Sequence, residues 1–183
     1  MTVSFFFFQK YRYLKRVSRL HRELGIPRDY AQQRRIPIQM EAADLASIGP
    51  DIYEREQRLL AGAVPAWDSM QKSAAGDGIR LQVVSAYRSV SYQEGIIRRK
   101  LEKGQAIDEI LRVSAAPGYS EHHTGRAIDF STPDFPVLEE DFERSEAFLW
   151  LTKNAGAFGF KMSFPRDNPH GVIYEPWHWA WQG

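Results

Sequence analysis

The first part of the chain carries apolar side chains at helical spacing. Between Tyr11 and Leu24 they fall on one stripe, and basic residues occupy the other faces of the predicted helix. The stripe consists of Leu14, Val17, Leu20 and Leu24. Such a helix either packs on its own domain, which is the simpler interpretation, or lies on an anionic membrane surface. The run Phe5 to Phe8 ahead of it is expected to be a strand or a disordered start.

The middle of the chain predicts a helix, a strand and a second helix. The first helix is expected to begin near Pro65, which suits a first helical turn, and to end before the GDG sequence. Alternating apolar residues in IRLQVVSAY then indicate a half-buried strand. Ser91 and Glu94 form a predicted capping box for the next helix, which Gly104 ends.

The last third of the chain predicts three strands and one helix. Residues 127–130 alternate as in a strand that follows a glycine-containing loop, and Ser145 caps a helix that ends at Gly159. Two closing strands are expected in FKMSFP and GVIYEPWHWAWQ, and the second carries three tryptophans at every second position. The chain is therefore expected to be a single α+β domain with a small antiparallel sheet and helices packed around it.

Length and composition fit one domain. The chain has 183 residues, of which 43% are hydrophobic, so one core of ordinary size is expected. The formal net charge of +1 gives no global field that would attract nucleic acid, and no nucleic-acid partner is expected. The absence of cysteine excludes disulfides, thiolate metal sites and a cysteine nucleophile.

Charge is distributed unevenly along the chain. Residues 1–30 hold seven basic and two acidic side chains, a net charge of +5, which leaves −4 for the remainder. Prolines at positions 27, 37 and 50 then punctuate an irregular connection. We therefore divide the chain into residues 1–50, a basic helix with an irregular connection, and residues 51–183, the main domain. No run approaches the ~20 apolar residues that span a bilayer, so no transmembrane segment is expected.

Two short segments carry residues that bind metal ions. GYSEHHTGRAIDF contains His122 and Asp129 on either side of Gly125, a spacing that lets a tight loop bring the two side chains together. IYEPWHWAWQG supplies His178 as a third donor. A catalytic zinc ion takes three such ligands and leaves a fourth position for water. Glu175 stands three residues before His178, near enough to act on that water as a general base.

The same segments resemble the motifs of a known enzyme family. Residues 120–129 spell S-x-H-x-x-G-x-A-x-D and residues 175–178 spell E-P-W-H, as in the VanY-type zinc D-alanyl-D-alanine carboxypeptidases and their L,D-carboxypeptidase relatives. The upstream SAYRS, residues 85–89, together with Gln93 is similar to the family's S-x-Y-R-S-x-x-x-Q segment. The resemblance runs from about Ile79 to the end of the chain.

The resemblance implies a zinc-dependent carboxypeptidase that removes the C-terminal D-alanine from peptidoglycan stem peptides, with residues 51–183 as its catalytic domain. It implies that zinc is bound by His122, Asp129 and His178, and that Glu175 is the general base. Arg88 would then stabilise the oxyanion or pair with the terminal carboxylate of the substrate. The other residues expected at the substrate are Gln93, Ser120 and Trp177, of which Ser120 also holds the metal loop.

Two departures from the family pattern leave the scissile bond open. Relatives often carry a basic residue where this chain has Ser163, and another where it has Ala180. The choice between D,D and L,D bonds therefore stays open. Two other functions also remain as alternatives, a murein endopeptidase of the lysin type and a zinc-containing binding module without hydrolysis, although Glu175 and Arg88 argue against the binding module.

The remaining histidines are expected outside the metal site, and the compartment stays open. His21 is expected to be solvated, His123 to lie at the rim of the site and His170 in a loop. Peptidoglycan lies outside the cytoplasmic membrane, yet the charges near the start follow the apolar run, the wrong order for a secretory signal. Both an envelope enzyme and one that handles recycled fragments inside the cell fit this sequence.

Overall fold

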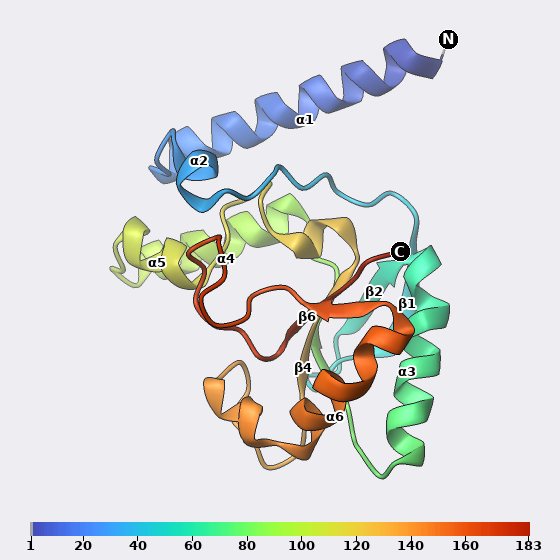
Figure 1. Cartoon of the computed structure of the whole chain (residues 1–183). Helices are drawn as coiled ribbons and strands as arrows, with labels where there is room; N and C mark the ends of the chain where they lie inside the picture. The colour runs from blue at the N-terminus through green and yellow to red at the C-terminus, as the bar shows by residue number, and fades with distance from the viewer. Residues whose placement is uncertain (1) are drawn as a thin grey trace.

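The computed structural model describes residues 2–183, and their side chains from residue 7 onward (Figure 1). Its helices are α1 (Thr2–Leu24), α2 (Tyr30–Arg34), α3 (Val64–Gly76), α4 (Val90–Glu102), α5 (Ile107–Val113) and α6 (Glu146–Asn154). Its strands are β1 (Leu45–Pro50), β2 (Glu56–Leu60), β3 (Gln82–Ser85), β4 (Ala127–Ser131), β5 (Phe160–Met162) and β6 (His178–Trp181). Short 3₁₀ helices are η1 (Ala61–Ala63), η2 (Glu121–Thr124), η3 (Glu140–Arg144) and η4 (Ala155–Phe158).

A four-stranded antiparallel sheet in the order β3-β4-β6-β5 forms the centre of the fold, and β1 and β2 form a separate hairpin. All five residues of β4 are buried because this strand lies between β3 and β6. The register places Asp129 of β4 opposite His178 of β6. Side chains directly opposite each other in an antiparallel pair are close neighbours, so the sheet itself brings these two residues together.

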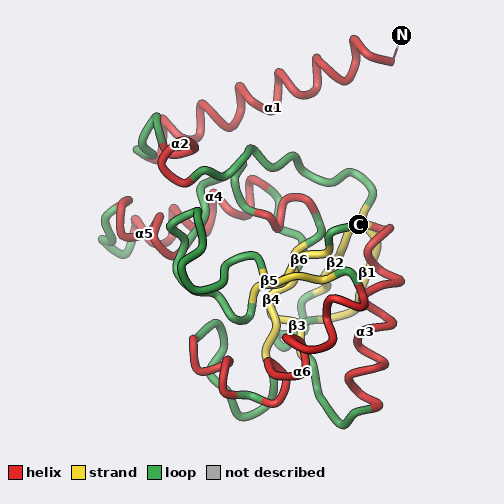
Figure 2. The backbone as a smooth tube through the Cα atoms, in the orientation of Figure 1, coloured by secondary structure: helices red, strands yellow, loops and turns green. Residues whose placement is uncertain are grey.

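The main hydrophobic core lies between the sheet and helices α3 and α6. Trp67 of α3 stacks on Phe130 of β4 with ring centroids 5.5 Å apart, and Trp177 and Trp179 belong to the same core. Figures 1 and 2 show α1, α2, α4 and α5 gathered at the other end of the molecule. There the buried stripe of α1 packs on Val90 of α4.

Two glycines allow close approaches that position the site. Gly125 follows η2 with a φ of +66°, and a Cβ there would lie 2.8 Å from the backbone nitrogen of Leu60. Gly118 has a φ of +87°, and a Cβ there would lie 2.8 Å from both γ-carbons of Val17 in α1. Only glycine adopts such a φ without strain and leaves room for the neighbour. The loop from Gly118 to Gly125 is therefore held between α1 and β2.

The structure confirms the α+β class, the antiparallel sheet and most predicted elements, including α3, β3, α4, β4 and α6. The two closing strands are shorter than predicted, because β6 begins only at His178 and residues 171–177 form no strand. The cap of α4 is different, because the Ser89 hydroxyl accepts from the Tyr92 nitrogen at 3.0 Å while the Ser91 hydroxyl accepts from Arg16. Glu94 pairs with Arg98 one turn later. The capping box expected at Ser91 and Glu94 is therefore wrong by two residues.

The beginning of the chain differs more from expectation. The segment Phe5 to Phe8 is neither a strand nor disordered, because α1 starts at Thr2. Each residue added to an existing helix gains a hydrogen bond, so the packed half of α1 extends backward through the phenylalanines. The expected irregular connection contains α2 and β1, and β1 pairs with β2 across position 50. The division at residue 50 stays a prediction.

No helix within the described residues is long and apolar enough to cross a bilayer.

Candidate metal centre and cleft

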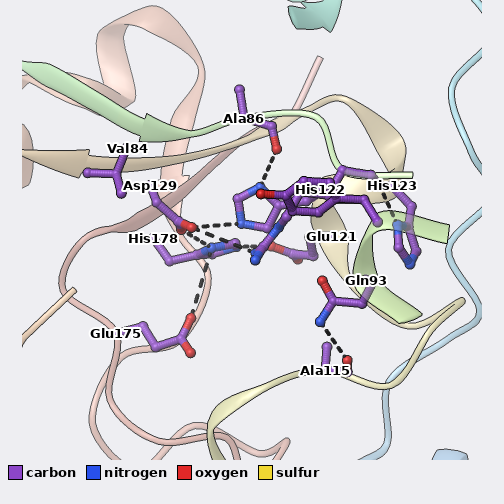
Figure 3. A network of polar contacts seen from close by, with 12 residues as sticks. Val84, Ala86, Gln93, Ala115, Glu121, His122, His123, Asp129, Glu175 and His178 are labelled. Carbon is purple, nitrogen blue, oxygen red and sulfur yellow. Dashed lines mark hydrogen bonds and ion pairs between the residues drawn. The ribbon is translucent and has the colours of Figure 1, made fainter. Parts of the chain in front are cut away.

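Three buried side chains converge at one end of the central sheet. His122 lies in η2, Asp129 in the middle of β4 and His178 at the start of β6. One nitrogen or oxygen atom from each lies within 4.8 Å of the others (Figure 3). The three residues whose spacing predicted a metal site are therefore brought together by the fold.

The ring of His122 is oriented by the backbone of the loop that follows β3. Its Nδ1 donates a hydrogen bond to the carbonyl oxygen of Ala86 at 2.5 Å. Burial lowers the pKa of His122 to about 4, so the ring is neutral at pH 7 and carries its proton on Nδ1. Nε2 then presents a lone pair that has no hydrogen-bond partner among the described residues.

The lone pair of His122 faces a carboxylate oxygen. Nε2 of His122 lies 3.1 Å from Oδ2 of Asp129, and the imidazole groups of His122 and His178 outweigh burial and hold the pKa of the Asp129 carboxyl well below its usual range. Two electron-rich atoms at this distance, both buried, repel each other unless a cation lies between or beside them. A divalent ion with nitrogen and oxygen ligands fits this arrangement.

A chain of hydrogen bonds holds Ala86, the residue whose carbonyl orients His122. The Ala86 nitrogen donates to Oε1 of Gln57 at 2.9 Å, and Nε2 of Gln57 donates to Oδ2 of Asp51 at 2.8 Å. The Asp51 carboxylate is itself buried and receives further bonds from Arg55. Residues of the hairpin β1–β2 and its turn thus fix the position of Ala86. This matters for the metal site because a metal-ligating histidine is oriented by the partner of its second nitrogen.

His178 has a carboxylate at each ring nitrogen. Nδ1 lies 2.9 Å from Oδ1 of Asp129, and Nε2 lies 2.9 Å from Oε2 of Glu121. Burial disfavours the imidazolium, but the hydrogen bonds to Asp129 and Glu121 outweigh it and raise the pKa of His178 to about 10. Both nitrogens therefore carry protons in this arrangement. A metal ion on Nδ1 would replace one of them, since only the deprotonated nitrogen coordinates.

Two glutamates beside His178 have opposite pKa shifts. Burial raises the pKa of Glu175 to about 7, and its Oε2 lies 3.9 Å from Nδ1 of His178. Burial acts on Glu121 too, but the hydrogen bond from His178 outweighs it and lowers the pKa of Glu121 to about 2. Environments that separate two carboxyl pKa values in this way assign them different roles. Glu121 is suited to permanent charge and Glu175 to proton transfer near neutral pH.

Arg88 and Gln93 line the cleft that opens beside these residues. Nη2 of Arg88 lies 3.7 Å from Oδ2 of Asp129, and its Nε is buried without a partner among the described residues. Nε2 of Gln93 donates to the Ala115 carbonyl at 2.8 Å, which leaves a buried Oε1 that also lacks a partner. The cleft therefore offers one unused donor and one unused acceptor, and buried polar atoms of this kind usually have partners in the working state of a protein.

Ser120 lines the cleft as expected, but Trp177 does not. Ser120 is buried, and its carbonyl accepts from the His123 nitrogen at 3.1 Å, so it stabilises the loop that carries His122. Trp177 belongs to the main hydrophobic core and is absent from the cleft walls. The alternation of tryptophans carries Trp177 to the side of the sheet that faces α3 and α6. The placement of Trp177 gives no support to the substrate contact expected of it.

Two other histidines are more buried than expected. His123 is not at the rim, because it is fully buried, donates from Nδ1 to the Arg88 carbonyl at 2.6 Å and accepts from the Gly118 nitrogen at 3.0 Å. His21 is half-buried, with its Nε2 2.8 Å from the Pro117 carbonyl. His170 lies in a loop, as predicted. His123 and His21 therefore hold the adjacent residues Gly118 and Pro117, where the loop that leads to the metal site begins.

Sequence reasoning missed Glu121 and Phe164. Glu121 adjoins His122, and a carboxylate next to a predicted metal ligand was a usable signal for a residue that supports another ligand. The ring of Phe164 lies 5.0 Å from the ring of His178 and forms part of the cleft wall. The family pattern around Ser163 and Phe164 indicated that this segment bears on the substrate, but the contact of Phe164 with His178 arises only because the loop after β5 returns to the site in three dimensions.

Comparison with known proteins places this arrangement in a family. Residues 56–183 match the family model described as VanY, D-alanyl-D-alanine carboxypeptidase. The chain is 31% identical over 167 residues to the YodJ protein of Bacillus subtilis, covering 83% of this chain and 58% of that protein. The chain thus spans less than two thirds of this curated relative.

Two solved structures share the fold. The LD-carboxypeptidase LdcB superposes with a TM-score of 0.71 at 29% identity, over 80% of this chain and 72% of that one. A vancomycin-resistance D,D-pentapeptidase VanY of the VanB type, solved in complex with Zn(II), superposes with a TM-score of 0.62 at 25% identity, over 82% and 89% of the two chains. The family model covers more than half of the sequence and includes every residue of the candidate metal centre. The chain belongs to the VanY D-alanyl-D-alanine carboxypeptidase family.

Proposed function

We propose that this protein is a zinc-dependent carboxypeptidase that removes the C-terminal residue, a D-alanine, from peptidoglycan stem peptides. The observation that carries the proposal is the unpartnered lone pair of His122 facing the Asp129 carboxylate, with His178 completing three donors in a buried cluster. Membership of the VanY family, and a relative that binds Zn(II), support zinc as the ion and a peptide bond as the target.

Each ligand is given one coordinating atom by its hydrogen bonds. His122 offers Nε2 because its Nδ1 donates to Ala86, and His178 offers Nδ1 because its Nε2 is bound to Glu121. Asp129 has one carboxylate oxygen next to each histidine, Oδ2 beside His122 and Oδ1 beside His178. A zinc ion held by these three residues supplies Lewis-acid activation of water and of the scissile carbonyl.

Glu175 is the proposed general acid and base. Its pKa of about 7 leaves it able both to accept a proton from the attacking water and to return one to the departing amino group. Burial keeps the pKa of Glu175 raised. The Glu175 carboxylate lies 3.9 Å from Nδ1 of His178, so it is next to the proposed metal site. A carboxyl of ordinary pKa would be a poorer proton donor at neutral pH.

Arg88 and Gln93 are the proposed recognition pair. A peptide C-terminus presents a carboxylate, which accepts hydrogen bonds, and an amide N–H, which donates one. The unused Nε of Arg88 matches the carboxylate, and the unused Oε1 of Gln93 matches the N–H. A charge-assisted bond in a desolvated cleft is stronger than a neutral one, so Arg88 favours substrates with a free terminus over internal bonds.

The choice between D,D and L,D bonds is separate from this recognition, and the relatives include enzymes named for each. Ser163, which follows β5, stands where relatives often carry a basic residue. Its nitrogen donates to the His178 carbonyl at 3.4 Å, so the segment lies beside the metal site. The residue at 163 is therefore a candidate for setting which stem peptide is accepted.

Mass spectrometry of products from defined tri-, tetra- and pentapeptide stems tests the proposal. We expect loss of a single C-terminal residue from one of these peptides, and a preference of at least ~10-fold in kcat/KM for a free over an amidated terminus, about 1.4 kcal/mol. Equal kcat/KM for peptides with free and amidated termini would favour a murein endopeptidase, which would still be a zinc hydrolase. A zinc-loaded protein that hydrolyses none of the stems would leave only a binding module.

A further inference from the structure

The outer face of α1 is an apolar stripe that the described chain leaves uncovered. Phe7, Tyr11 and Leu14 are 66%, 53% and 38% exposed. Their spacing of four and three residues aligns them along one side of the helix. The buried residues of α1, beginning at Tyr13, follow a neighbouring side, about 120° around the helix axis. The helix therefore has two apolar stripes, of which only one is used by the fold.

Basic side chains border the outer stripe. From Thr2 to Arg22 the helix contains six lysines and arginines and no acidic residue. Two of them already cover aromatic rings, with the Arg12 guanidinium 5.7 Å from the Phe8 ring and the Lys15 ammonium 4.6 Å from the Tyr11 ring. Among the described ion pairs, those from this part of α1 involve Arg16 and Arg19 only. Most of the positive charge is thus available to a partner.

The first turns of α1 point away from the body of the protein (Figure 1). Residues 7–12 are all exposed, so no packing on the domain stabilises this part of the helix. A helix without an apolar contact is marginal in water, and an exposed patch of aromatic side chains usually marks an interaction site. Covering the outer stripe would stabilise the helix and remove the aromatic rings from water.

We propose that the outer face of α1 binds the surface of a lipid bilayer that carries anionic headgroups. Aromatic and aliphatic side chains on one face with lysine and arginine beside them are the features of helices that lie in the headgroup region. The complementary charge selects this occupant over a second copy of the chain, because two such helices would bring together like charges with no acidic residues to pair them. A bilayer surface requires no spanning segment.

Binding of α1 to a bilayer would be independent of the proposed hydrolysis, since no residue of the metal centre takes part. Sedimentation of the 183-residue chain with vesicles tests the proposed binding. We expect at least ~10-fold tighter binding to phosphatidylcholine vesicles that contain phosphatidylglycerol than to phosphatidylcholine alone. The variant Arg12→Gln/Lys15→Gln should lose most of that preference, since each basic residue near an anionic surface contributes about a factor of five.

An aromatic variant separates insertion at the headgroups from simple charge attraction. Phe7→Ser/Tyr11→Ser should bind the anionic vesicles about 10-fold more weakly, whereas Leu138→Ser/Leu149→Ser, which removes exposed apolar side chains elsewhere, should bind as the wild type does. Circular dichroism checks that each variant keeps its fold. Equal binding to both kinds of vesicle, or an aromatic variant that binds normally, would overturn the proposal. Self-association through α1 without vesicle binding would overturn it in favour of a second copy.

Discussion

The residues around His178 and those on the outer face of α1 are held in opposite ways. Around His178, both ring nitrogens have carboxylate neighbours at 2.9 Å, and all three proposed metal ligands are buried. On α1, Phe7 and Tyr11 are more than half exposed, and the one described ring contact of Tyr11 is with Lys15 of the same helix. The first arrangement is fixed before any ligand arrives. The outer face of α1 remains exposed among the described residues.

Substitutions in the two regions are therefore expected to act differently. A change at the metal centre removes an atom from a preorganised network, so it should alter metal affinity or turnover sharply. A change on α1 removes surface from an interaction outside the domain, so it should leave both unchanged. The three predictions below test this separation.

The largest effect is expected from Glu175→Gln. The amide cannot accept the proton, so turnover on a stem peptide should fall by ~10²–10⁴-fold while zinc content stays at the wild-type level. Kinetics and metal analysis of the same preparation check both statements. His178→Ala is the matched control, because it should lose zinc as well as activity. Comparable turnover in Glu175→Gln would refute its role as a base.

An intermediate effect is expected from Glu121→Gln. The amide no longer provides a charged partner for Nε2 of His178, and loss of such a partner typically lowers metal affinity by 10–100-fold. Competition with a chelator measures this without recourse to activity. Glu140→Gln, an exposed site that pairs with Arg166, is the control and should leave the affinity unchanged. If both variants bind zinc alike, the network around His178 is not what sets the affinity.

The smallest effect is expected from acid acting on His21, which joins α1 to the body. Burial lowers the pKa of His21 from its ordinary value of 6.5, despite the bond to the Pro117 carbonyl. The docked state therefore binds fewer protons than a detached or unfolded one. The contact of neutral His21 therefore stabilises the docked helix fully above pH 6.5, and this stabilisation is lost as the pH falls below that value. The other groups facing this ring are Tyr30 and Tyr119, which are neutral in this range.

Hydrogen exchange of α1 amides, corrected for intrinsic rates, measures this loss. Protection relative to the sheet should decrease between neutral pH and pH 5 in the wild type and should stay constant in His21→Asn. His170→Asn, a change in a loop remote from α1 in sequence, should retain the wild-type pH dependence. A pH dependence that survives in His21→Asn would assign it to another group.

Much of this protein follows from local pattern. The apolar stripe of α1, the helix after Pro65 and the alternation at 127–130 predicted elements that the structure contains, because periodicity records which face of an element is buried. The spacing of His122 and Asp129 across a glycine also predicted their convergence. These properties depend on residues close together in sequence, or on a motif whose parts occur in a fixed order.

The surroundings of these residues, in contrast, depend on the folded arrangement of distant segments. The backbone of Ala86 orients His122, Gln57 holds Ala86, and Glu121 reaches His178 across 57 positions. Burial gives Glu175 its raised pKa and removes His123 and Trp177 from the cleft. Such properties depend on which distant segments exclude water from a side chain and which polar atoms they bring to it. Hydrogen bonds and desolvation act over a few ångströms in space, a distance that sequence separation does not encode.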